Sequence, residues 1–250
     1  MKNMQKIFNA LKIAAAFAAA QFALAAAAPA QTAEEYFMLG NNAYKAGDFA
    51  KAERNYSDAE KLGLKSAELY FNRANANVKN NAPAKALADY LKTLAIAPRM
   101  REASANLSAL SREFSVAAPD TDSPFFELSQ SEWIAATIAC FWIFILLAIV
   151  QPLYGKGGKA VFFLALTAAA ATVVGGFGIK KWSDFGATAV VVKQDAPVKL
   201  SPAPNAPIET RLSEGKTVAV KKRLGGYVFA EIGGSRAGWI DAADVSQIGE

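Results

Sequence analysis

Two long runs of apolar residues, without a single charge, interrupt the middle of the chain. They cover residues 133–154 and 160–179 and read WIAATIACFWIFILLAIVQPLY and AVFFLALTAAAATVVGGFGI. At about 1.5 Å per residue, a helix formed by either run is long enough to cross a hydrocarbon layer about 30 Å thick. The pattern therefore predicts two transmembrane helices. Because only residues 155–159 separate them, they must form an antiparallel hairpin, which places both flanking regions on the same side of the membrane.

The charges beside this hairpin indicate its orientation. The connecting loop carries Lys156 and Lys159 and no acid, which by the positive-inside rule predicts that the loop lies in the cytoplasm. Lys180 and Lys181, at the far end of the second run, argue more weakly for the opposite orientation, although lysines at helix ends also reach toward lipid headgroups. The orientation that the loop favours has both flanking regions outside the cytoplasm.

Residues 1–30 have the pattern of a secretory signal peptide and support the same orientation. Three lysines precede the apolar stretch 13–28. Ala28 and Ala30 supply small residues at both positions that determine cleavage, so we expect cleavage after Ala30. An uncleaved signal anchor is the alternative, and with either outcome the residues that follow are exported.

Residues 31–114 show the 3.6-residue periodicity of α-helices, and they contain an internal repeat. When the segment 33–66 is laid over 67–100, ten identical residues coincide, and each unit has two helical stretches with a break between them. The pattern predicts helix hairpins at 33–66 and 67–100 and a capping helix at 99–114. The superposed residues are Ala33, Glu34, Tyr36, Phe37, Asn41, Lys45, Ala50, Lys51, Ala52 and Tyr56 of the first unit on Ala67, Glu68, Tyr70, Phe71, Asn75, Lys79, Ala84, Lys85, Ala86 and Tyr90 of the second.

A 34-residue period with these residues resembles the tetratricopeptide repeat. Three positions depart from that motif, because Arg73 stands at the leucine position, Thr93 at the last small position and Leu64 at the terminal proline. The resemblance implies stacked helices in which small residues permit close approach and aromatic rings fill the remaining volume. The matching residues are Tyr36, Leu39, Gly40, Ala52, Tyr56 and Ala59 in the first unit and Tyr70, Ala74, Ala86, Tyr90 and Pro98 in the second.

Arrays of this family bind extended peptides in a concave groove lined by the first helix of each pair, so the resemblance implies a groove here. Asparagine suits it because its amide both donates to and accepts from a peptide backbone; the alternative is that the asparagines are family consensus and merely solvated. Capture of a C-terminal carboxylate is not expected, because this chain has Phe37, Glu68 and Glu102 where that function needs basic residues. The small groove would hold a short segment or pack against a neighbouring domain. The implied groove residues are Phe37, Asn41, Tyr44, Lys45, Phe71, Asn72, Asn75, Lys79 and Asn106.

Two linkers are expected beside the hairpin, at 115–132 and at 180–188. The first contains prolines and acids and no basic residue, which is typical of an acidic tether. Phe125, Phe126 and Leu128 come shortly before the first apolar run, where aromatic residues collect at the headgroup level. A contact with a partner is the alternative for these three residues.

The last part of the chain, residues 189–248, changes to short β-type runs separated by glycine-containing turns. A segment of this size can bury a core by closing into a small barrel. The order of its elements, with Gly238-Trp239-Ile240 near its end, resembles a bacterial SH3 domain. The resemblance implies that Tyr227 and Trp239 line a ligand groove, while the alternative is that Trp239 closes the barrel core. The predicted strands are 189–193, 208–212, 217–222, 227–232 and 237–240.

The composition excludes several function classes. The net charge of +5 arises from lysines in the signal peptide and beside the hairpin, so it does not indicate nucleic-acid binding. Cys140 is the sole cysteine and lies within the first apolar run, so the chain has no intramolecular disulfide and no thiolate metal cluster. The chain has no histidine, which removes Ser-His and Cys-His catalysis and the usual zinc ligands. We therefore expect no enzyme, metal or cofactor.

In its order of parts, the whole chain resembles the BatE-type proteins of aerotolerance operons: signal peptide, tetratricopeptide pair, transmembrane hairpin and SH3 domain. The resemblance implies an inner-membrane protein whose soluble domains face the periplasm and bind von Willebrand-type membrane proteins that work with a MoxR-type ATPase. The predicted function is a non-enzymatic scaffold for envelope proteins. The alternative is a cell-wall anchor that binds peptidoglycan through its SH3 domain.

Overall fold

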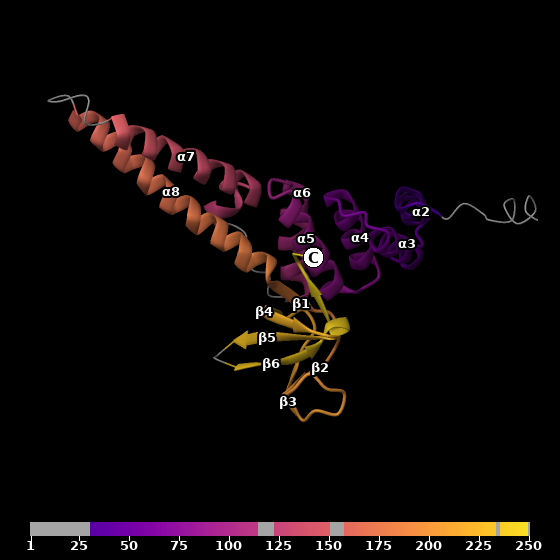
Figure 1. Ribbon diagram of the computed structural model, residues 1–250. Helices are drawn as coiled ribbons and strands as arrows, with labels where there is room; N and C mark the ends of the chain where they lie inside the picture. Colours follow the sequence, from indigo (N-terminus) through magenta and orange to yellow (C-terminus); the bar gives the residue numbers. More distant parts are fainter. Residues whose placement is uncertain (1–30, 115–122, 151–157, 234–235, 250) are drawn as a thin grey trace, which may run out of the picture.

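The computed structural model shows a helical array, a hairpin of two long apolar helices and an antiparallel β-domain, in chain order (Figure 1). The predicted signal peptide at 1–30, with Ala28 and Ala30, lies outside the described residues. Segments 115–122 of the expected acidic linker and 151–157 around the hairpin loop also lie outside them. The described residues are 31–114, 123–150, 158–233 and 236–249.

The helical array repeats with the period of the sequence, since α4 begins one repeat length after α2 and α5 begins one repeat length after α3. Polar residues mark the helix starts: Thr32 and Glu35 form a capping box on α2, and Ser66 caps α4 by accepting from a backbone N–H. Asp48 caps α3, and Pro83 occupies the first turn of α5, where no N–H is needed. The helices are α2 Ala33–Lys45, α3 Phe49–Lys61, α4 Ala67–Lys79, α5 Pro83–Ile96 and α6 Arg101–Phe114.

Small residues bring the two helices of a pair close together. A Cβ added to Gly40 of α2 would lie 2.5 Å from the ring of Tyr56 on α3, so only glycine fits there. Ala52 and Ala59 are fully buried beside it. In the second pair Ala74 takes the place of Gly40 and packs with Tyr90. The helical region therefore resembles a tetratricopeptide array in its packing as well as in its period.

A buried cluster of charges joins the two repeats. Arg73 donates through Nε and Nη2 to the two carboxylate oxygens of Asp89, at 2.9 and 2.7 Å, and through Nη1 to Glu60. Lys92 Nζ lies 3.1 Å from the other Glu60 oxygen, and Asn77 Nδ2 donates to Asp89 over 3.0 Å. Arg73 stands where the repeat motif has leucine, and its buried positive charge is compensated by two acids from neighbouring helices.

This cluster predicts that stability falls in acid. Burial alone would raise the pKa of the Glu60 carboxyl, but the charges and hydrogen bonds of Arg73 and Lys92 outweigh burial and lower the pKa from 4.5 to about 2. The stabilisation is present above pH 4.5 and is lost as the pH falls toward 2, because the unfolded chain then binds the proton more readily. In urea unfolding at pH 6, Glu60→Gln should have a lower free energy of unfolding than the wild type. The difference between the two proteins should be smaller at pH 3. Glu34→Gln, at an exposed position, should show no such convergence.

The apolar hairpin consists of α7, Gln130–Val150, and α8, Gly158–Gly186, both long and apolar enough to cross a membrane. Close contact between the helices depends on glycine: a Cβ at Gly175 would overlap the side chain of Thr137, and one at Gly178 would overlap the ring of Trp133. The outward side chains of the hairpin are large and apolar, including Trp142, Leu146, Ile149, Phe163, Leu166 and Phe177.

The close contact can be tested with two neighbouring glycines of α8. Gly178→Leu should lower the melting temperature of the detergent-solubilised protein, since overpacking typically costs about 1–3 kcal/mol. Gly176→Leu should leave it unchanged, because a Cβ at Gly176 meets no atom within 4 Å. Equal effects of the two substitutions would contradict this packing.

The β-domain is one antiparallel sheet of seven strands in the order β3-β2-β6-β5-β4-β1-β7, curled around its own core. Two strands were not predicted: β2, which includes Pro197, and the short β7. The core side chains include Val191, Val198, Leu212, Val218, Val228, Ile232, Ile240 and Val245. The strands are β1 Thr188–Val191, β2 Ala196–Lys199, β3 Ile208–Leu212, β4 Thr217–Leu224, β5 Tyr227–Gly233, β6 Arg236–Asp241 and β7 Val245–Gln247.

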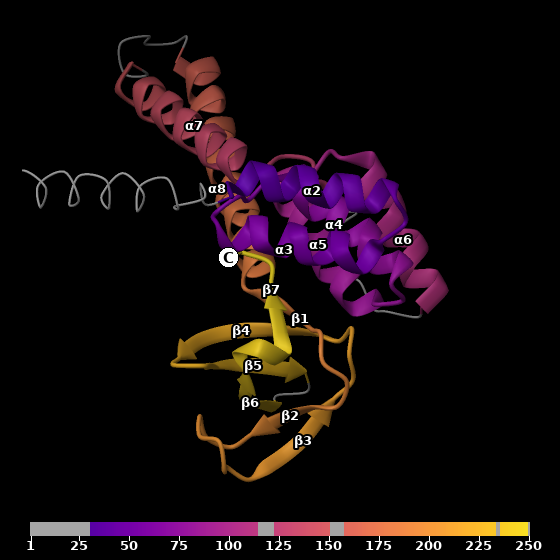
Figure 2. The same cartoon turned by 90° about the vertical axis from the view of Figure 1, so that its right-hand side faces the viewer.

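The helical array, the end of α8 and the β-domain share one core at the base of the hairpin (Figures 1 and 2). Trp182 and Phe185 of α8 are buried there, together with Val190 and Ile248 of the β-domain and leucines of α5 and α6. The segment 180–188, expected to be a linker, is therefore helical as far as Gly186, because this face of α8 packs against the array. A short 3₁₀ helix, η1, Pro124–Phe126, also joins this core through Phe126.

Other element bounds also differ from the expected ones. The helix α7 begins within the expected linker 115–132, at Gln130, and the helix α8 begins within the expected loop 155–159, at Gly158. The serine and acid at the start of α7 explain the earlier start, because Ser129 and Glu132 hydrogen-bond each other and the exposed backbone of that turn. The capping helix starts at Arg101 rather than at residue 99.

Candidate functional site

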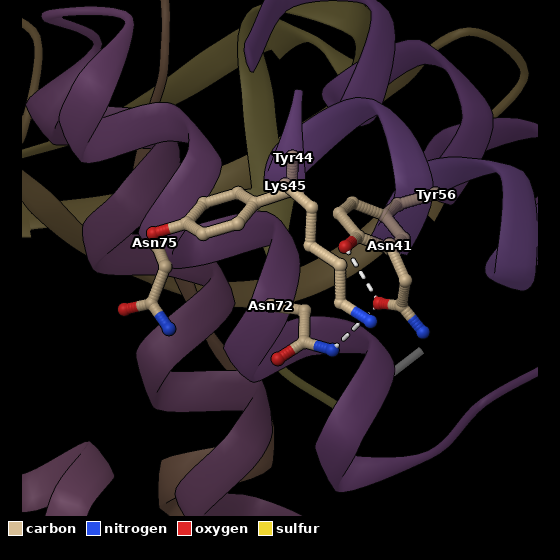
Figure 3. A pocket seen from close by; sticks show the side chains of 6 residues that line it. All are labelled: Asn41, Tyr44, Lys45, Tyr56, Asn72 and Asn75. Carbon is tan, nitrogen blue, oxygen red and sulfur yellow. Dashed lines mark hydrogen bonds between the residues drawn. The ribbon is translucent and has the colours of Figure 1, made fainter. Parts of the chain in front are cut away.

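A cavity of about 300 Å³ opens on the face of the array where α2 and α4 lie side by side (Figure 3). In Figure 3 the Lys45 side chain extends toward Asn41 and Asn72, and the ring of Tyr44 extends toward Asn75. Five of the six residues that line this cavity belong to the groove implied by the sequence. The lining residues are Asn41, Tyr44, Lys45, Tyr56, Asn72 and Asn75.

Asn41 is held in place by two neighbours. Its Oδ1 accepts a hydrogen bond of 2.8 Å from the Tyr56 hydroxyl and another of 3.0 Å from Asn72 Nδ2. Its Nδ2 has no acceptor among the described residues. The asparagine is therefore neither loosely solvated nor free to rotate, and it presents an N–H donor to the groove.

The same arrangement recurs one repeat further along. Asn75 Oδ1 accepts from the Tyr90 hydroxyl at 2.6 Å and from Asn106 Nδ2 at 3.1 Å. A second cavity, of about 170 Å³, lies beside these residues and shares Tyr44 and Asn75 with the first. The second cavity is lined by Tyr44, Asn75, Val78, Lys79, Tyr90, Asn106, Ala109, Leu110 and Glu113.

The two tyrosines remain hydrogen-bond donors at any physiological pH. Burial raises the pKa of Tyr56 to about 12, and burial likewise raises the pKa of Tyr90 to about 12. Neither tyrosine was among the residues implied to line the groove. The signal that could have indicated them is that Tyr56 coincides with Tyr90 when the two repeats are superposed. They act through Asn41 and Asn75, whose orientation they fix.

The remaining predicted groove residues divide into two kinds. Phe37 packs against the ring of Tyr56 and Phe71 against that of Tyr90, at 5.8 and 6.1 Å between centroids. The two phenylalanines therefore hold the tyrosines in place and do not line either cavity. Lys45 and Lys79 are exposed and form no ion pair with any described residue. The groove is thus electropositive at two corresponding positions.

In the β-domain, Trp239 and Tyr227 lie on the face of the sheet that is turned away from its core. Successive residues of a strand point to opposite faces, and Ile240 next to Trp239 belongs to the core. The Trp239 ring packs against Phe229 at 5.3 Å, and Lys222 Nζ lies 5.1 Å from its centroid. Trp239 is buried, with only 8% of its surface exposed, but it packs with Phe229 and Lys222 and does not belong to the cluster around Val228 and Ile240.

The described part of the chain contains no group of three or more His, Cys, Asp or Glu side chains that could hold a metal ion. Cys140 is a free cysteine on α7.

No family model matches the chain, and no curated protein matches it in sequence. Among solved structures, the TPR domain of Arabidopsis OM64 matches with 20% identity, a TM-score of 0.32, and coverage of 60% of this chain and 93% of that domain. The chain itself comprises a helical repeat region resembling tetratricopeptide repeats, two apolar helices and an antiparallel β-domain.

Proposed function

We propose that the protein is a non-enzymatic adaptor that binds segments of other proteins in the groove of its helical array. The observation that carries this proposal is the pair of asparagines, each fixed by a tyrosine and by a second asparagine, that line adjoining cavities. Because these side chains are already held in place, binding a peptide in the groove costs little side-chain entropy.

The position of the β-domain supports the proposal. Its strands β1 and β7 pack against α5, the second helix of its pair, whereas the groove is lined mainly by the first helices, α2 and α4. The groove therefore remains open to a partner. This arrangement disfavours the alternative that the groove is filled by the neighbouring domain.

The apolar hairpin supports membrane attachment. Large apolar side chains cover the outer surface of α7 from Ile134 to Ile149 and of α8 from Phe162 to Phe177. Such a surface is stable in contact with lipid and unstable in contact with water. Lys156 and Lys159 favour a cytoplasmic position for the loop between the two helices. In that orientation the protein is an inner-membrane scaffold whose helical array and SH3-like β-domain face the periplasm. Its proposed partners are envelope proteins of the von Willebrand type in a BatE-like system with a MoxR-type ATPase, acting in aerotolerance or envelope stress.

The experiment that tests the adaptor function is affinity purification of the tagged full-length protein in mild detergent, followed by mass spectrometry. Asn41→Glu with Asn75→Glu should fill both cavities with repelling carboxylates and remove the specific partners. Asn42→Glu with Asn80→Glu, which lie close by in the chain but outside both cavities, should retain them. Retention of every partner by the groove variant would overturn the proposal.

A second candidate function is binding of the cell wall through the β-domain. The observation that favours it is the face of the sheet turned away from the core, where the half-buried Tyr227 and Phe229 and the buried Trp239 lie with Lys199 and Lys222 over their rings. Aromatic faces and cations suit sugar rings that carry carboxylates. Detergent-solubilised protein should then pellet with purified wall sacculi, and Trp239→Ala should abolish pelleting; no pelleting by the wild type would exclude this function.

A further inference from the structure

The groove is built from two corresponding compartments, one between α2 and α4 and the other between α4 and α6. The first has Asn41, Asn72 and Lys45, and the second has the residues one repeat later, with matching hydrogen bonds. The shared Tyr44 and Asn75 make the two cavities continuous neighbours. The two compartments therefore present the same polar groups to a ligand, although their volumes differ, at about 300 and 170 Å³. The second compartment comprises Asn75, Asn106 and Lys79.

Each compartment offers the same three interactions. In the first, Asn41 Oδ1 is fully engaged, so its Nδ2 remains to donate, while Asn72 uses Nδ2 and keeps Oδ1 to accept. These two groups match the C=O and N–H of a peptide unit. Lys45 adds an unpaired cation beside them, which matches an acidic side chain. One compartment thus fits one acidic residue of an extended peptide.

The distance between the compartments fixes how far apart two such residues must be. The helices α2 and α4 are direct neighbours, joined by the Asn72–Asn41 bond, and neighbouring helix axes lie about 8–10 Å apart. A polyproline II segment rises about 3.1 Å per residue with three residues per turn, so residues i and i+3 lie about 9 Å apart on one face. In a β-strand, residues on one face lie about 7 or 13 Å apart.

Resting on the adaptor function proposed above, we propose that the groove selects an internal acidic peptide in the polyproline II conformation with two acids three residues apart. One carboxylate pairs with Lys45 and the other with Lys79, while the asparagines hold the backbone between them. The ligand needs no free C-terminus. Glu113 also lines the second compartment and weakens its hold on an acid.

The test is fluorescence anisotropy of the full-length protein in detergent micelles with labelled, C-terminally amidated peptides that differ only in acid spacing. The peptide with acids at i and i+3 should bind about fivefold more tightly than those at i and i+2 or i and i+4, as expected for one additional exposed ion pair. Glu113→Gln should tighten its binding further. Added salt should remove the preference.

A matched pair of double variants identifies the lysines. Lys45→Gln with Lys79→Gln should remove the preference for the i, i+3 peptide, whereas Lys51→Gln with Lys85→Gln, also one repeat apart but outside both cavities, should preserve it. Equal affinity for all spacings, or no binding of any peptide, would overturn the inference. If partners are nevertheless lost from the Asn41→Glu, Asn75→Glu protein, the adaptor function stands and only the spacing rule fails.

Discussion

Replacing Arg73 by alanine is expected to destabilise the helical array by about 3–5 kcal/mol, because it leaves a buried carboxylate without its bidentate partner. Asp89 is almost fully buried, and without Arg73 only Asn77 and its own helix remain to stabilise its charge. Glu60 loses one of its two cations in the same substitution. The free energy of unfolding of the full-length protein in detergent, measured with urea, gives the magnitude.

A second substitution separates the effect of leaving the Asp89 charge unpaired from the effect of lost packing. Adding Asp89→Asn to Arg73→Ala removes the uncompensated charge, so the double variant should be more stable than Arg73→Ala alone. Lys61→Ala, which removes an exposed partner of Asp58, should leave the free energy of unfolding close to that of the wild type. A double variant that is less stable than Arg73→Ala would show that packing, and not charge, explains the loss.

The helical array could be predicted in detail because its determinants are local. The identity between the two units gives the period, and residues such as Thr32, Ser66 and Pro83 mark helix starts wherever the rest of the chain lies. The buried ion cluster could not be predicted, because Arg73 is noticeable only as a departure from the motif. Its partners Glu60 and Asp89 come from other helices, and nothing local relates them to it.

Outside the array, long-range contacts decided the structure where local signals pointed elsewhere. No strand was predicted between residues 193 and 208, yet Pro197 lies in β2. This strand pairs with β3 along its length but with β6 only at Lys199, so one side of β2 has few ladder hydrogen bonds and a missing N–H is tolerated. Lys180 and Lys181 favoured the end of a helix, yet α8 continues because Trp182 and Phe185 become buried against the array.

The candidate groove was predictable in position but not in chemistry. Asn41, Asn72 and Asn75 follow from the resemblance to the repeat motif, and the structure places all three at one cavity. The resemblance does not say whether the oxygen or the nitrogen of each amide is already engaged. That depends on side-chain geometry, here on the hydroxyls of Tyr56 and Tyr90, and it determines which donors remain for a ligand.

Trp182 is the residue on which the connection between the hairpin and the soluble parts depends most. Its indole Nε1 lies 2.8 Å from the Leu128 carbonyl oxygen and 3.1 Å from that of Phe125, so it joins the end of α8 to the segment that precedes α7. Its ring makes edge contacts with Phe126 and Phe185, both at the base of the array. Trp182 also shares a buried cluster with leucines of α5 and α6, which connects the hairpin to the helical array.

Trp182→Ala should destabilise this junction by about 3–5 kcal/mol, the usual cost of removing a buried aromatic side chain. Hydrogen exchange of the protein in detergent should show loss of backbone protection at residues 124–128 and 182–188, with the centres of α2 and α4 unaffected. Trp182→Phe keeps most of the packing and should lose only about 1–3 kcal/mol, because the Leu128 carbonyl loses its donor while the Phe125 carbonyl still accepts from the Trp133 indole N–H. Trp142→Ala, at a side chain 63% exposed on α7, should leave both segments protected. Unchanged protection in Trp182→Ala would mean that other contacts, such as those of β1 and β7 with α5 and of Arg99 with Glu132, fix the array, and the groove would then keep its orientation to the membrane without the tryptophan.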